Sequence, residues 1–142
     1  MARIRIDIPE RSLGTFIIPV RITDLNYGNH LGNDSFVSII HEARVQWLSS
    51  LGYSELDIEG IGVIMSDLAI EFKSESFYGD IIEVELSVGE ISKVGFELFY
   101  ELLTKRNHAE ILLARAKTGM LCYDYNMKKV ASVPMKLTEA LS

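Results

Sequence analysis

The chain has 142 residues, 48% of them hydrophobic, and a formal net charge of −6. This length and apolar content suffice for one domain with its own core, and the acidic balance argues against nucleic-acid binding, which draws on a positive surface. The single Cys122 excludes an intramolecular disulfide and a zinc site. Because no run of about 18 apolar residues and no leader pattern is present, we expect one cytoplasmic domain over residues 1–142, without membrane spans.

Two short strands are predicted at the start of the chain. Residues 4–8 alternate apolar and charged side chains and end before Pro9, a period of two that is typical of a strand. Residues 15–23 predict a second strand. Within it, Pro19 cannot donate to a ladder and therefore indicates a sheet edge or a bulge.

A polar loop follows and leads into an apolar helix. Residues 24–34 read Asp-Leu-Asn-Tyr-Gly-Asn-His-Leu-Gly-Asn-Asp. Asn33 or Asp34 can cap the first helical turn, and Gly52 can end the last one. The loop is thereby held at the positive end of the helix, a place suited to a carbonyl oxygen or an anion. At about 100° per residue, one apolar stripe of this helix consists of Phe36, Ile40, Ala43, Trp47 and Leu51.

The remainder of the chain predicts one strand after another, over residues 61–74, 81–91, 94–104 and 110–125. The turn-like gaps at residues 78–80, 91–93 and 105–109 are too brief for anything but antiparallel connections. Pro134 is placed to open a terminal helix. These elements predict an α+β domain in which a long antiparallel sheet curls around one central helix. The predicted strand over residues 94–104 has apolar residues on both faces. One face can pack on the helix, and the other needs a further partner such as a second subunit, which suggests a homodimer or homotetramer.

This order of elements resembles the hotdog fold, and the loop resembles the signature of the 4-hydroxybenzoyl-CoA thioesterase-like family of acyl-CoA thioesterases. That family has Asp-x-Asp-x-x-Gly-His-Val-Asn-Asn followed by a helix containing Glu-Ala-Arg. Here the run is Asp24-Leu25-Asn26-Tyr27-Gly28-Asn29-His30-Leu31-Gly32-Asn33, followed by Glu42-Ala43-Arg44. The resemblance covers most of the chain. It departs where the family's second aspartate, its usual catalytic carboxylate, falls on Asn26.

The resemblance implies hydrolysis of an acyl-CoA or acyl-carrier thioester, without a cofactor, at a site shared between subunits. Because an amide cannot act as a base or nucleophile, the candidate carboxylates are Asp24 and Glu42. Asn26 and His30 are then expected to position the thioester. Further substrate contacts are expected from Tyr27, Gly32, Asn33, Asp34 and Asp67, and the CoA phosphates are assigned to Lys73, Lys105 and Arg106.

Each of these catalytic residues also has a purely structural interpretation. His30 can satisfy backbone groups at the helix entry, Asn26 can stabilise a turn, and Asp24 can tie the loop down. Glu42 lies opposite the apolar stripe and can simply be solvated. Asp67 lies within an apolar strand, where an unpaired buried carboxylate would cost free energy. Because side chains alternate along a strand, Asp67 can instead face water.

Two other functions remain compatible with the sequence. A hotdog enoyl-CoA hydratase also uses an acid and a histidine, but its loop normally keeps a true aspartate at the place of Asn26. A non-catalytic acyl-CoA-binding protein is the third possibility, and Asn26 is the strongest argument for it. The sequence leaves open the acyl group, the choice between CoA and acyl carrier protein, and the number of subunits.

Overall fold

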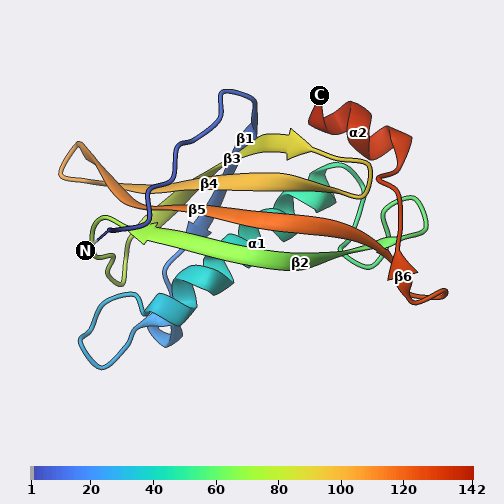
Figure 1. Cartoon of the computed structure of the whole chain (residues 1–142). Coiled ribbons are helices and arrows are strands. Elements are labelled where there is room, and N and C mark those ends of the chain that lie inside the picture. Colours follow the sequence, from blue (N-terminus) through green and yellow to red (C-terminus); the bar gives the residue numbers. More distant parts are fainter. Residues whose placement is uncertain (1) are drawn as a thin grey trace.

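A computed structural model describes residues 2–142 and shows an antiparallel sheet packed on one long helix (Figure 1). The sheet has the order β1-β3-β4-β5-β2, with β6 paired to β5 and every neighbouring pair antiparallel. The elements in chain order are β1 (Ser12–Pro19), the 3₁₀ turn η1 (Ile22–Asp24), α1 (Asn33–Ser50), β2 (Gly62–Phe72), β3 (Ile81–Ile91), β4 (Gly95–Arg106), β5 (Ala109–Asp124), β6 (Lys129–Val130) and α2 (Met135–Leu141). The predicted α+β architecture is confirmed.

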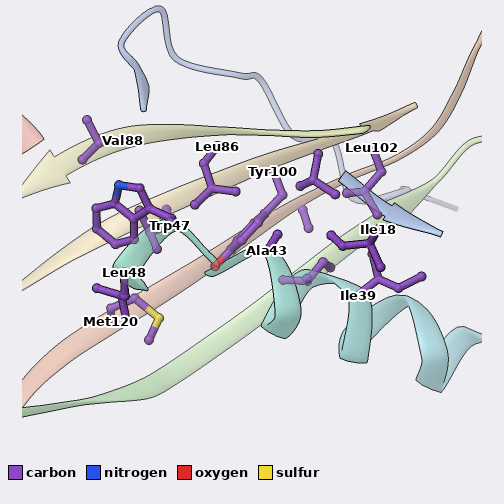
Figure 2. Close-up of a cluster of buried hydrophobic side chains, with 14 of the residues drawn as sticks. Ile18, Ile39, Ala43, Trp47, Leu48, Leu86, Val88, Tyr100, Leu102 and Met120 are labelled. Atoms are coloured by element: carbon purple, nitrogen blue, oxygen red, sulfur yellow. The ribbon is translucent and has the colours of Figure 1, made fainter. Parts of the chain in front are cut away.

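The core lies between the apolar face of α1 and the concave face of the sheet. Figure 2 shows Trp47, Leu48 and Ala43 of α1 directed toward side chains of β3, β4 and β5. The predicted stripe is buried from Phe36 through Trp47, and only Leu51, just past the last turn, is exposed. Since burial of apolar area is the main favourable term in folding, this face places the helix on the sheet.

The ends of α1 differ in part from the prediction. The N-cap is Gly32, and among residues 2–142 no side chain caps the start of the helix. Asn33 and Asp34 already lie in the first turn and are exposed. Gly52 has the expected left-handed conformation, with a φ of 83°, and ends the helix. The first N–H groups of α1 are therefore left without a side-chain acceptor.

The predicted strand over residues 4–8 is wrong. This segment pairs with no other strand; it is held where the buried Ile6 donates its N–H to a carboxylate oxygen of Glu71, at 3.2 Å. Of the alternating isoleucines, only Ile6 is buried, whereas Ile8 is half-buried and Ile4 is exposed. The next strand, β1, lies on the sheet edge, as Pro19 indicated, but it spans Ser12–Pro19 and not residues 15–23. After Pro19 the chain turns into η1.

The C-terminal helix α2 follows Pro134, as predicted, and buries Leu137 and Leu141. Among residues 2–142, no helix combines the length and apolar character required to cross a membrane.

Trp47→Ala tests the helix–sheet interface. The indole is 2% exposed and meets the ring of Phe96 edge to face, with centroids 6.3 Å apart. Its removal should lower the free energy of unfolding by about 3–5 kcal/mol, measured by urea denaturation. Ser49→Ala, at an exposed position of the same helix, is the control and should change it by less than about 0.5 kcal/mol. An unchanged midpoint for Trp47→Ala would mean that another face of α1 carries the core.

Candidate active site

The polar loop closes on itself before α1 begins. Asn26 donates its N–H to the carbonyl oxygen of His30 at 2.9 Å, and its own carbonyl oxygen accepts from the N–H of Asn29 at 3.1 Å. The side-chain oxygen of Asn26 accepts from the N–H of Gly28 at 2.8 Å. This hydrogen bond stabilises the turn, which is the structural role predicted for Asn26. Within residues 2–142 no protein group accepts from the amide nitrogen of Asn26, which therefore keeps its donors for a ligand.

Asp24 is buried and fully engaged with Arg21. Its carboxylate accepts from the Arg21 backbone N–H at 2.8 Å and from the guanidinium at 3.1 and 3.4 Å. Burial alone would raise the pKa of Asp24, but the hydrogen bonds from Arg21 outweigh it and hold this pKa below its ordinary value. A carboxylate of lowered pKa is a weak proton acceptor, so these contacts favour the structural interpretation of Asp24.

A cavity of about 250 Å³ lies between α1 and the edge strand β1. Asp24 and Glu42 both line it, beside Ile17 and Ile39. Glu42 is exposed and accepts a hydrogen bond from the side-chain nitrogen of Gln46 at 2.9 Å. Of the two predicted carboxylates, Glu42 is therefore the one left accessible to a substrate or water.

A second cavity, of about 320 Å³, lies between the first turn of α1 and the end of β2. We call it the His30 cavity. His30 Nε2 lies 3.7 Å from a carboxylate oxygen of Glu75, and His30 Nδ1 lies 3.3 Å from the carbonyl oxygen of Leu31. Phe36 and Phe72 meet edge to face at 5.2 Å and form an apolar wall. The cavity thus combines an uncapped helix start, an imidazole, a carboxylate and an apolar wall.

Glu75 and Phe72 were not predicted from the sequence as site residues. They come from the end of β2 and the segment after it, far from the polar loop along the chain. No local pattern around Glu75 distinguishes it from other exposed glutamates. Only the folded chain brings it beside His30.

Three of the four predicted catalytic residues line two different cavities of one chain, and Asn26 lines neither of them. His30 lines one, whereas Asp24 and Glu42 line the other. With a rise of about 1.5 Å per residue, Glu42 lies roughly 13 Å along α1 from Asn33. A carbonyl group held at the start of α1 is therefore out of reach of Glu42 of the same chain.

The predicted substrate contacts are also dispersed. Asn33 lines the His30 cavity, whereas Tyr27 is fully exposed at the tip of the loop. The N–H of Gly32 donates to the carbonyl oxygen of Asp24 at 3.1 Å, so it is not free for a substrate. Asp67 lies elsewhere, on β2, bound to the Lys117 ammonium at 2.8 Å and to a backbone N–H. The hydrogen bond from Lys117 lowers the pKa of Asp67, as expected for an ion pair.

All three predicted phosphate ligands already have carboxylate partners, and for Lys73 this partner is Glu71, at 2.8 Å. Arg106 binds Asp80 at 2.7 and 2.9 Å, and Lys105 lies 3.7 Å from Glu83. Lys73 alone borders the His30 cavity. In residues 2–142, no group of three or more His, Cys, Asp or Glu side chains is arranged to hold a metal ion.

Comparison with known proteins decides the family. A model of the thioesterase-like superfamily matches residues 20–141. The chain belongs to this superfamily. A 1,4-dihydroxy-2-naphthoyl-CoA hydrolase from Synechocystis is 28% identical to this chain over 134 residues. The match covers 91% of this chain and 96% of the relative.

Solved structures agree with this assignment. A 1,4-dihydroxy-2-naphthoyl-CoA thioesterase from Synechocystis superposes with a TM-score of 0.79 and 26% identity, covering 89% of this chain and 93% of that one. A mutant 4-hydroxybenzoyl-CoA thioesterase complexed with 4-hydroxybenzoyl-CoA has a TM-score of 0.81 at 17% identity, covering 93% and 99%. The predicted hotdog fold and acyl-CoA thioesterase family are confirmed. The chain is an acyl-CoA thioesterase.

Proposed function

We propose that this thioesterase-like protein hydrolyses an acyl-CoA thioester whose carbonyl oxygen is held at the first turn of α1, in the His30 cavity. The observation that carries this proposal is the uncapped start of α1 beside the imidazole of His30. Attack on a thioester builds negative charge on the carbonyl oxygen, and N–H groups aimed at it stabilise that charge. The wall of Phe36 and Phe72 supports an apolar or aromatic acyl group, consistent with the aromatic acyl-CoA substrates named for the relatives.

The carboxylate that activates water is proposed to come from Glu42 of a second subunit. Within one chain Glu42 is roughly 13 Å along α1 from the proposed carbonyl site. The supporting observation is that the edge strand β2 ends at the His30 cavity and exposes Met65 and Phe72, an arrangement suited to a second copy. Glu75 is the competing candidate, because it already lies 3.7 Å from His30 in the same chain.

A panel of acyl-CoAs tests the proposed reaction. Purified protein should release free thiol from apolar and aromatic acyl-CoAs, and the His30→Ala variant should lose about 10²-fold or more of this rate. The absorbance of an enoyl-CoA is followed in parallel. Loss of that absorbance without thiol release would indicate a hydratase, and binding without either change would indicate an acyl-CoA-binding protein.

Mixed oligomers test whether the site is shared. The Glu42→Gln and His30→Ala variants should each be inactive when assayed alone. Light scattering on each should still give a particle larger than the 16.0 kDa chain. If the two residues meet across a dimer, refolding an equal mixture should restore about one quarter of the parental activity, because half of the dimers then hold one intact site. Glu75→Gln is the matched control and should remain active. Activity in Glu42→Gln together with its loss in Glu75→Gln would instead assign the base to Glu75.

Asn26→Asp tests the departure from the family pattern. A carboxylate oxygen can accept the same N–H of Gly28, so the loop should keep its shape. If Glu42 is the base, a second acid nearby raises one of the two pKa values, and the acid limb of the pH–rate profile should move to higher pH while activity persists at neutral pH. Asn29→Asp adds the same charge at an exposed loop position and should leave the profile unchanged. A rise in thiol release of about 10²-fold would show instead that the parental site lacks its base.

A further inference from the structure

A strongly basic cavity of about 410 Å³ lies next to the His30 cavity. Its lining comes from the N-terminal segment and from the end of β2. Figure 1 shows these two parts of the chain side by side. Four cationic side chains line it, against the single carboxylate of Glu71. These side chains, which we call the basic cluster, are Arg3, Arg5, Lys73 and Arg115.

The basic cavity and the His30 cavity share two residues. Phe72 and Lys73 line both of them, so the cavities adjoin at the last residue of β2 and the one after it. The N-terminal segment is fixed there by the buried Ile6, whose N–H donates to Glu71. The burial of Ile6 and this hydrogen bond therefore hold the segment that carries Arg3 and Arg5 against β2.

The members of the basic cluster differ in how much of their charge is already neutralised. Lys73 lies 2.8 Å from Glu71, and Arg115 lies 3.0 Å from Glu101. Arg3 and Arg5 are exposed, and neither has a hydrogen-bond or ion-pair partner within the described residues 2–142. In a chain of net charge −6, two unpartnered guanidinium groups beside two further cations mark this cavity as a local site for an anion.

We propose that the basic cluster binds the phosphate groups of the CoA nucleotide, while the pantetheine arm passes Phe72 to bring the thioester to His30. The inference rests on the proposed hydrolysis of an acyl-CoA thioester and names the residues that bind the nucleotide of CoA. Guanidinium groups suit this role because their planar fork forms two parallel hydrogen bonds to phosphate oxygens. The 3′-phosphate and the diphosphate of CoA present several anionic groups in a small volume, whereas the phosphopantetheine arm of an acyl carrier protein presents a single phosphodiester.

The double variant Arg3→Gln/Arg5→Gln tests this assignment. Its KM for acyl-CoA should rise about tenfold or more, because charge-assisted hydrogen bonds are lost, while kcat stays unchanged. Kinetics with the matching acyl-pantetheine, which lacks the nucleotide, should be the same for the variant and the parent. The melting temperature should also be unchanged, since neither arginine has a partner in the fold. The control Lys93→Gln/Lys136→Gln removes the same charge from the β3–β4 turn and from α2, and it should leave the KM unaltered. Figure 1 shows both elements at the end of the sheet away from the N-terminal segment.

Binding of adenosine 3′,5′-bisphosphate and of free CoA, measured by calorimetry on the full chain, gives a readout independent of hydrolysis. The parent should bind both, more weakly as salt is added, and the Arg3→Gln/Arg5→Gln variant should bind about tenfold more weakly. No binding by the parent, or equal binding by parent and variant, would overturn the assignment even if thioesters are hydrolysed. Charge-dependent CoA binding without hydrolysis of any thioester would support the assignment and reject the proposed reaction.

Discussion

The structure depends on the burial of one face of α1 against the curved sheet. A helix must bury its apolar stripe against another element, and the long strands β3, β4 and β5 supply that surface here. The curvature leaves α1 flanked by the two sheet edges, β1 and β2. The two cavities beside α1 lie at these edges, so the helix that forms the core also positions both candidate site regions.

A polar network fixes α1 within this apolar interface. The buried Arg44 donates to Glu55 at 2.9 Å and to the hydroxyl of Tyr100 at 3.1 Å, and Tyr100 lies 2.8 Å from the hydroxyl of Thr118. Within residues 2–142, no buried side-chain nitrogen or oxygen lacks a hydrogen-bond partner. A buried guanidinium is tolerated only when its donors are satisfied, so its partners restrict how α1 can rotate or slide on the sheet. Because Glu42 and the polar loop are attached to α1, the same contacts orient the candidate catalytic groups.

The chain has a net charge of −6 but contains a local cavity lined mainly by cations. Carboxylates neutralise many of the cations, as Asp80 does for Arg106 and Asp67 does for Lys117. Arg3 and Arg5 differ, since they face a cavity without such partners. An acidic composition therefore argues against an extended nucleic-acid surface, while it leaves room for a small anion site.

The sequence by itself determined the central helix, the long antiparallel strands and the polar loop at the helix start. These features follow from local rules: the stripe from Phe36 to Trp47 repeats with the period of a helix, and the loop resembles a family signature. Alternation over residues 4–8 misled because a period of two in the sequence does not require a neighbouring strand, and the folded chain fully buries only Ile6 of the alternating isoleucines. Only the tertiary structure placed Glu75 beside His30, separated His30 from Glu42, and joined Arg3 to Arg115 in one cavity. These contacts join segments far apart in the chain, and their geometry depends on how the sheet curls, which no local pattern of residues encodes.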